Sequence, residues 1–121
     1  MPRTEVVFFA EENGDCLLIT WMDRLPRKAQ DKCIVRIERL GEMGYELRRP
    51  EADFFRDGIY ELRAALGSIQ YRILYFFNEK QSVISRGLIK QAKEAPPKEI
   101  DLAIERKTRF ALSPLKHTYA E

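Results

Sequence analysis

The sequence predicts an α+β protein in which two N-terminal helices and one C-terminal helix pack on a mainly antiparallel sheet. Three observations lead to this prediction. Residues 59–90 contain three runs rich in Ile, Tyr, Phe, Leu and Val, separated by short turns, which is typical of an antiparallel meander. Residues 15–43 carry apolar side chains at helical spacing. A proline pair at Pro96 and Pro97 opens a further amphipathic segment.

The N-terminal third of the chain predicts one strand and two helices. Residues 5–9 form the strand, residues 15–24 the first helix and residues 27–43 the second, with a break at Pro26 between the helices. The second helix buries one stripe of side chains. The residues expected in this stripe are Ala29, Cys33, Ile37 and Leu40. We therefore expect a helical hairpin that covers one face of the sheet.

The remainder of the chain predicts four strands and a helix. A connection follows the second helix and includes a short strand at Phe54-Phe55. The three long strands cover residues 59–66, 69–78 and 82–90, and the last helix begins at the proline pair. Acidic residues near its start and basic residues near its end fit the helix dipole. We expect a single domain over residues 1–110 and a flexible tail over residues 111–121.

Composition limits the class of protein. The chain has 121 residues with 45% hydrophobic content, which suits one domain with one core. Lys and Arg number 21 and Asp and Glu 19, so the formal net charge is only +2. A protein that coats duplex DNA without specificity usually carries a larger excess of positive charge. Any basic surface must therefore be local, with the acidic residues elsewhere.

The cysteines and the apolar runs indicate a cytoplasmic protein. Cys16 and Cys33 have no partner at the spacing of a zinc site, and we expect them to be buried thiols. The N-terminal residues lack the long apolar run of a signal peptide, and no stretch approaches the ~20 apolar residues of a membrane span. We expect neither a metal nor another cofactor.

Four cations of the meander are candidates for a shared surface. Side chains alternate between the two faces of a strand. Arg63 therefore shares a face with Glu61, and Arg72 shares a face with Leu74 and Phe76. Arg86 and Lys90 share a face with Ile84 and Leu88. If the strands are in phase, all four cations project from one side, although a one-residue slip would invert a strand. Such a surface could bind a phosphodiester backbone, and a solvated sheet face is the alternative.

Three separated segments resemble the RelE/ParE toxin superfamily, in particular its phage-derived HigB-like group. Residues 57–63, DGIYELR, resemble the G-x-x-E-L-R strand of that group. Residues 71–77, YRILYFF, are similar to its Y-R-x-x-Y strand. Residues 87–90, GLIK, followed by PPKEIDLAIER at 96–106, resemble its G-F-x-K-K and P-x-x-E-I-x-x-A ending. The resemblance covers roughly residues 5–110, and the order and spacing of the motifs are its most specific feature.

The resemblance implies a RelE-like fold and the toxin of a type II toxin–antitoxin pair. Such toxins enter the ribosomal A site and cleave mRNA there by attack of the 2′-hydroxyl, without a metal. The implied partners are mRNA on the ribosome and a cognate antitoxin, expected to be a helix-turn-helix protein, with no membrane involved. Other members of the superfamily poison DNA gyrase, so the fold does not fix the target. The alternative is a ParE-like or degenerate toxin that acts as a protein-binding module.

The matched motifs suggest catalytic residues. Arg63 and Arg72 are expected to bind phosphate, because a guanidinium stays charged and its planar fork fits phosphate oxygens. Lys90 matches the first lysine of the family motif and is expected to bind phosphate or act as an acid. Glu61 shares a face with Arg63 and is a candidate general base, with a simple ion pair to that arginine as the alternative.

Two positions depart from the family pattern. Arg86 stands where related toxins often carry His, and Gln91 stands where a second Lys is common. This matters because His exchanges protons near neutral pH, whereas Arg is nearly always protonated. The only histidine, His117, falls in the predicted tail. The sequence therefore does not identify the general base.

Further residues are expected to contact RNA, either by charge or by stacking. Aromatic side chains often hold splayed single-stranded bases. The candidates are Arg86, Arg109, Phe76, Phe110 and Tyr119. For Phe110, packing between the last helix and the sheet is the alternative.

Overall fold

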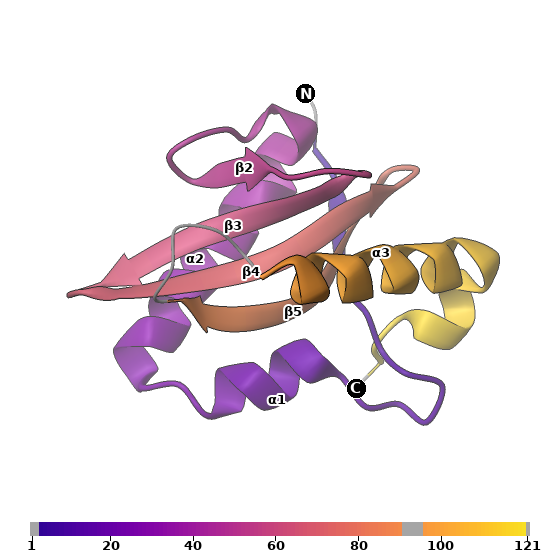
Figure 1. The fold of residues 1–121 in the computed structure, drawn as a ribbon, viewed down its shortest axis with the longest axis horizontal. Coiled ribbons are helices and arrows are strands. Elements are labelled where there is room, and N and C mark those ends of the chain that lie inside the picture. Colours follow the sequence, from indigo (N-terminus) through magenta and orange to yellow (C-terminus); the bar gives the residue numbers. More distant parts are fainter. Residues whose placement is uncertain (1–2, 91–95, 121) are drawn as a thin grey trace.

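The computed structural model describes residues 3–90 and 96–120 and contains a five-stranded sheet with helices on both faces (Figure 1). The strand order is β1-β5-β4-β3-β2. The parallel pair β1–β5 is joined to three antiparallel pairs, so the sheet is mainly antiparallel. The predicted α+β class is confirmed. The strands are β1 (Glu5–Phe8), β2 (Ala52–Phe54), β3 (Ile59–Leu66), β4 (Ile69–Asn78) and β5 (Gln81–Lys90).

The helices occupy the two faces in the predicted way. Helices α1 (Leu17–Asp23) and α2 (Arg27–Met43) cover one face, with α1 along β5 and α2 behind the sheet in Figure 1. Helix α3 (Pro97–Leu112) crosses the other face and covers one half of it. Two short 3₁₀ helices follow α2 and α3, at Gly44–Glu46 and Pro114–His117. Within the described residues, no helix combines the length and the apolar character that a bilayer span requires.

Each face of the sheet has its own apolar core. The core under α1 and α2 contains the side chains of β4 that alternate toward it, as the sequence predicts. Its largest fully buried members are Leu18, Leu40, Leu62, Tyr71, Ile73, Tyr75 and Ile84. The core under α3 contains the opposite set: Ile59, Leu74, Phe76, Val83, Ala103 and Phe110. Cys33 is fully buried on the α2 side, and this burial raises the pKa of its thiol to about 11.

A β-bulge at Ser85 changes which side chains of β5 face α3. Leu74 pairs with Arg86, whereas the next residue, Tyr75, pairs with Ile84, so Ser85 is the extra residue. Ile84 therefore lies in the core under α1 and α2. The prediction that Ile84 shares a face with Arg86 was wrong, because strict alternation fails at a bulge. Without the extra residue, Arg86 would point to the other side of the sheet.

The C-terminal segment packs on β1, which differs from the predicted flexible tail. His117 is 3% exposed, its ring stacks on Phe9 with centroids 4.9 Å apart, and its Nδ1 lies 2.8 Å from the Ala10 carbonyl oxygen. The Tyr119 amide donates to the Phe8 carbonyl at 2.8 Å. The physical reason is that the edge strand β1 offers backbone groups that need partners, and the returning chain supplies them.

Glu51 fastens the connection before β2 to helix α2. Arg39 donates to both of its carboxylate oxygens, at 3.0 and 3.1 Å, and Arg36 lies 3.3 Å from one of them. The hydrogen bonds from Arg39, together with the charges of both arginines, lower the pKa of Glu51 against the opposing effect of its partial burial. The connection is thereby held beside the start of β2.

This ion pair predicts an acid-dependent loss of stability. A carboxylate whose pKa is lower in the folded state stabilises that state fully above its unfolded pKa, near 4.5, and less as the pH falls through the folded value. We expect Arg39→Gln to lower the urea midpoint at pH 6 and to reduce the further drop between pH 6 and pH 3. Lys116→Gln, which breaks no ion pair among the described residues, is the control. An unchanged pH dependence in Arg39→Gln would contradict the assignment.

Candidate nucleic-acid interface

Three arginines, Arg63, Arg72 and Arg86, project from the face of the sheet on which α3 packs. We call the surface that they form the cationic face. Arg63 pairs directly with Arg72 across β3 and β4, and Arg72 pairs with Leu88 on β5. Directly paired residues share a face, so the predicted phase of these strands is confirmed. Arg86 joins the face because of the bulge at Ser85. Helix α3 covers one half of this face of the sheet (Figure 1).

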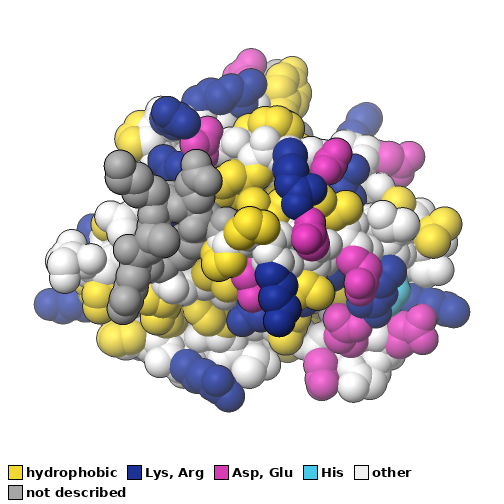
Figure 2. Space-filling view, viewed as in Figure 1, with side chains coloured by type: hydrophobic (Ala, Val, Ile, Leu, Met, Phe, Trp, Pro, Cys, Tyr) yellow, Lys and Arg dark blue, Asp and Glu magenta, His cyan; other side chains and the backbone are white. Residues whose placement is uncertain are grey.

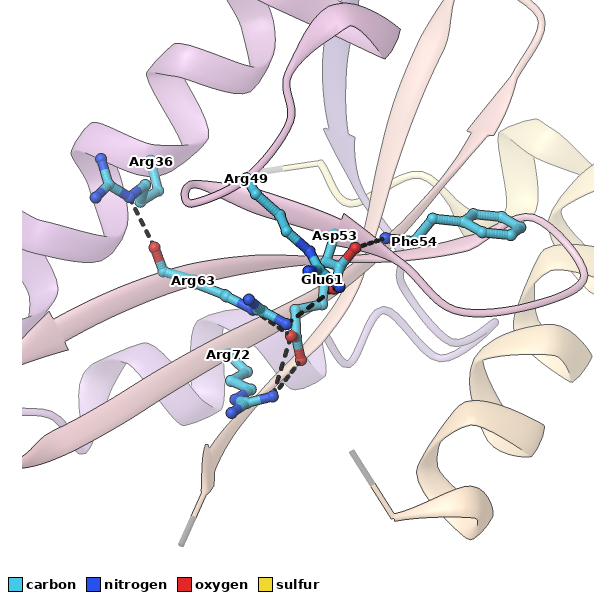
Figure 3. Close-up of polar contacts among 7 residues, drawn as sticks. All are labelled: Arg36, Arg49, Asp53, Phe54, Glu61, Arg63 and Arg72. Atoms are coloured by element: carbon cyan, nitrogen blue, oxygen red, sulfur yellow. Dashed lines mark hydrogen bonds and ion pairs between the residues drawn. The ribbon is translucent and has the colours of Figure 1, made fainter. Parts of the chain in front are cut away.

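A buried carboxylate, Glu61, holds two arginines of this face together (Figure 3). Its side chain has no exposed surface. Arg63 Nε donates to Glu61 Oε2 at 2.7 Å, and Arg72 Nη1 lies 3.0 and 3.2 Å from the two carboxylate oxygens. The side chain of Arg72 is 8% exposed and that of Arg63 is 29% exposed. Arg63 is therefore the member of the pair that a ligand can reach.

Asp53 on β2 supplies a second carboxylate and links the cationic face to the loop before β2. Its Oδ2 accepts hydrogen bonds from Arg63 Nη2 at 3.0 Å and from Arg49 Nη2 at 2.8 Å. The hydrogen bond from Arg49 is the main reason why the pKa of Asp53 is lowered, and the charge of Arg63 adds to it. Two carboxylates thus accompany Arg63 and Arg72, so their charges are largely compensated and their orientation is fixed.

The sequence reasoning missed Arg106, a buried arginine behind Arg86. Its side chain comes from α3, the residue is 7% exposed, and its Nη1 donates to the hydroxyl of Ser85 at 3.0 Å. Burial, followed by repulsion from Arg86, lowers the pKa of this guanidinium. Arg86 in turn lies 3.7 Å from Glu99 at the start of α3. Arg106 therefore holds the bulge that turns Arg86 toward this face.

A signal for Arg106 was present in the helical pattern. Ile100, Ala103 and Phe110 form the buried stripe of α3, and Arg106 falls on the same stripe. An arginine on a buried stripe needs a polar partner, and here Ser85 provides it.

Several residues expected to contact RNA lie elsewhere. Phe76 and Phe110 are fully buried against each other, with ring centroids 6.0 Å apart, so neither presents a face to a base in this structure. For Phe110 the packing alternative is the one observed. Arg109 pairs with Glu11 at 2.6 Å and lies over the Phe9 ring, and Tyr119 packs against the core under α1 and α2. Helix α3 lies over the face of the sheet that carries Phe76, and its packing covers the ring that was expected to stack on an RNA base.

The remaining candidates are placed only in part. The backbone of Lys90 pairs with Gln70 at the end of β5, whereas its side chain, like Gln91, lies outside the described part of the structure. Glu61 is enclosed by its arginines and has no surface that a substrate hydroxyl can touch in this conformation. His117 is buried near β1 and contacts Phe9, so it does not join the cationic face.

The view onto α3 shows how the charges are distributed over this side of the protein (Figure 2). Basic and acidic side chains are interspersed over it rather than forming one continuous basic patch, and apolar side chains are exposed between them. The ion pairs of Arg56 with Asp101 and of Arg109 with Glu11 contribute to this mixture. On the part of this side that the structure describes, positive charge is therefore carried by separate arginines rather than by a broad basic surface.

A protein-family model matches most of the chain. The family model described as "Phage derived protein Gp49-like (DUF891)" matches residues 20–108. The matched segment runs from within α1 to near the end of α3 and includes every residue of the cationic face. A search of curated proteins returned no match.

Proposed function

Since the chain belongs to the phage-derived Gp49-like family, which is related to the RelE/ParE-like toxins, we propose that it is the toxin of a type II toxin–antitoxin pair. Within that class we propose a HigB/RelE-like endoribonuclease that cleaves mRNA in the ribosomal A site. The partners in this proposal are translated mRNA and a cognate antitoxin of the helix-turn-helix class.

The observation that carries the proposal is the convergence of Arg63, Arg72 and Arg86 on one face of the sheet. Their guanidinium groups match the geometry of phosphate oxygens and keep their charge at neutral pH. Guanidinium groups of this kind can hold the phosphate at which an RNA strand is cleaved. The two apolar cores and the buried carboxylate give these side chains a rigid support.

The proposed reaction is attack of a ribose 2′-oxygen on the adjacent phosphorus, with breakage of the bond to the 5′-oxygen. The products are a 2′,3′-cyclic phosphate and a 5′-hydroxyl, and the proton lost by the 2′-hydroxyl is balanced by the proton gained by the 5′-oxygen. Negative charge builds on the phosphate during attack, and preorganised cations stabilise it. We assign this role to Arg63 first, because it is the more exposed arginine of the Glu61 pair.

Glu61 acts in this proposal as a positioning residue rather than as the base. It has no exposed surface, and both of its oxygens accept hydrogen bonds from guanidinium groups. A carboxylate in this position fixes the rotamers of Arg63 and Arg72 before the substrate arrives. Such preorganisation avoids the cost of ordering two long side chains at the moment of reaction.

We expect Arg63→Gln to slow mRNA cleavage on programmed ribosomes by about 10²–10³-fold, the loss typical when one group that stabilises transition-state charge is removed. Primer extension on ribosomes carrying a defined message measures the rate. Arg39→Gln is the matched control, since Arg39 is also an ion-paired and partly exposed arginine but lies on α2, and it should cleave like the wild type. Equal rates for Arg63→Gln and the wild type would refute the assignment of Arg63.

One observation favours the second candidate, a protein-binding module without nuclease activity. The charges of Arg63 and Arg72 are compensated by Glu61 and Asp53, which is also what a purely structural ion-pair network would show. The wild-type protein distinguishes the two. Arrest of growth together with uncut message on purified ribosomes would support the binding module, whereas cuts in the A site support the endoribonuclease.

A further inference from the structure

A hollow of about 510 Å³ lies at the β2 edge of the sheet, and we call it the edge pocket. The residues of its lining that matter here are Arg48, Arg49, Asp53, Phe54 and Tyr60. Its volume lies within the range of pockets that hold small molecules and single nucleotides. None of the roles assigned above uses the aromatic part of this pocket.

The aromatic side of the edge pocket is the exposed ring of Phe54, which packs against Tyr60. Phe54 is 52% exposed, although it is a large apolar residue on an edge strand. Its ring forms a T-shaped pair with the ring of Tyr60, with centroids 5.0 Å apart and an interplanar angle of 63°. Tyr60 stacks in turn on Tyr75, at 5.3 Å and 21°. The inner rings therefore support Phe54, and about half of the residue stays exposed.

The polar side of the edge pocket is cationic. Arg48 is exposed and donates through Nη1 to the carbonyl oxygens of Tyr45 and Leu47. Among the residues that the structure describes, no carboxylate forms an ion pair with Arg48, in contrast to Arg49, which pairs with Asp53. Arg48 thus presents positive charge beside the rings without a compensating anion.

The edge pocket is joined to the cationic face by one residue. Asp53 lines the pocket, and its Oδ2 accepts hydrogen bonds from Arg49 of the loop and from Arg63 of the cationic face (Figure 3). The loop and the face are therefore neighbours across a single carboxylate. Phe54 pairs with Tyr60 and lies on the opposite side of β2 from Asp53, so an RNA strand with a phosphate at Arg63 reaches the edge pocket by passing around the β2 edge of the sheet.

We propose that the edge pocket binds one nucleotide of single-stranded RNA, with the base stacked on Phe54 and a phosphate at Arg48. This inference rests on the proposed function, because it assigns the pocket to a nucleotide that flanks the cleaved bond. An exposed aromatic ring beside an arginine is the usual arrangement for holding an unpaired base of any sequence. A nucleotide suits the pocket better than an acidic peptide, which would pair with cations but would not use the flat face of Phe54.

The test is a binding comparison that requires no cleavage. The probes are a fluorescein-labelled 2′-O-methyl RNA hexamer, which lacks the attacking hydroxyl, and an abasic hexamer of equal charge. Fluorescence anisotropy with the wild-type protein should show tighter binding of the base-containing probe by about tenfold or more, the usual contribution of stacking. Phe54→Ala should remove this preference and leave the affinity for the abasic probe unchanged. Phe54→Trp should preserve it.

A matched control excludes a general effect of exposed apolar surface. Ile69 is 45% exposed at the start of β4, next to the β3–β4 turn, so Ile69→Ala removes a similar exposed group and should keep the preference. Equal affinity of the wild type for both probes, as expected of a pocket that binds a protein, would overturn the inference. So would a preference that survives in Phe54→Ala, or a loss of affinity for both probes in that variant.

The outcome is separable from that of the proposed function. If the wild-type protein shows the Phe54-dependent preference but leaves ribosome-bound mRNA uncut, the nucleotide site is supported and the proposed endoribonuclease activity is refuted. If the wild-type protein cuts mRNA but binds both probes equally, the proposed endoribonuclease activity is supported and the nucleotide site is refuted.

Discussion

Replacing Arg72 by methionine is expected to lower the free energy of unfolding by about 3–5 kcal/mol, because it deprives the buried carboxylate of Glu61 of one of the two arginines that pair with it among the described residues. Glu61 has no exposed surface and Arg72 is 8% exposed at its side chain, so water cannot replace the lost partner. Arg63 remains at 2.7 Å from Glu61, but it is already shared with Asp53. Urea unfolding of the variant, followed by circular dichroism, measures the loss.

A double-mutant cycle separates the ion pair from the packing of the two side chains. Glu61→Gln combined with Arg72→Met removes both buried charges of this pair while keeping similar volumes. The double variant should therefore be more stable than Arg72→Met alone, since a buried charge without its partner is worse than a neutral pair. If the two single losses simply add in the double variant, Glu61 and Arg72 are not coupled and the arrangement described here is wrong.

This coupling also determines which substitution can test activity. A variant of Arg72 that fails to cleave RNA would combine a catalytic loss with partial unfolding. Arg63 avoids this problem in part, because it is more exposed and Glu61 keeps the buried Arg72 as its partner. For this reason the cleavage test above depends on Arg63.

Replacing Gly87 by alanine is expected to destabilise the protein by about 2–3 kcal/mol through overpacking against α1. Gly87 pairs with Ile73 on the face covered by α1 and α2. A Cβ atom at this position would lie 2.1 Å from Cε3 and 2.3 Å from Cζ3 of Trp21. Trp21 also forms a T-shaped pair with Tyr71, at 6.3 Å between centroids, so a movement of its ring would disturb this contact as well. Thermal unfolding measures the loss, and Trp21 fluorescence reports the shift of the ring.

Gly41→Ala is a matched control for this prediction. Gly41 lies inside α2, and a Cβ atom there would make an ordinary contact of 3.5 Å with Val6. Alanine favours a helix over glycine, so this variant should gain up to about 1 kcal/mol. A combined Gly87→Ala and Trp21→Leu variant should recover part of the loss. A Gly87→Ala protein as stable as the wild type would show that Trp21 does not pack on the strand.

The sequence predicted most of the fold because the main elements have strong local patterns. The bounds predicted for α2, residues 27–43, are the observed ones, since its apolar stripe and its stop signals agree. The bulge at Ser85 was not predictable, because nothing in the residues of β5 marks an extra position. The packing of His117 on Phe9 also escaped prediction, since it joins residues from opposite ends of the chain.

The candidate site was predictable as a set of side chains but not as a set of contacts. Alternation correctly placed Glu61, Arg63 and Arg72 on one face. It gave no sign that Glu61 is enclosed or that Asp53 from another strand approaches Arg63, since both depend on how β2 joins the sheet. Phe76 was expected to be available for stacking, and packing was the alternative for Phe110. The burial of both was not decided by alternation, because the half of the sheet that α3 covers is a tertiary property.

The bulge at Ser85 has a consequence for any change in the length of β5. The extra residue determines which face of the sheet each later side chain of β5 points to. Deleting that amino acid would turn Arg86 toward α1 and bring Gly87, which has no side chain, to the cationic face. A single-residue deletion there would leave the composition of the strand almost unchanged, but the residues that follow it would exchange the two faces of the sheet.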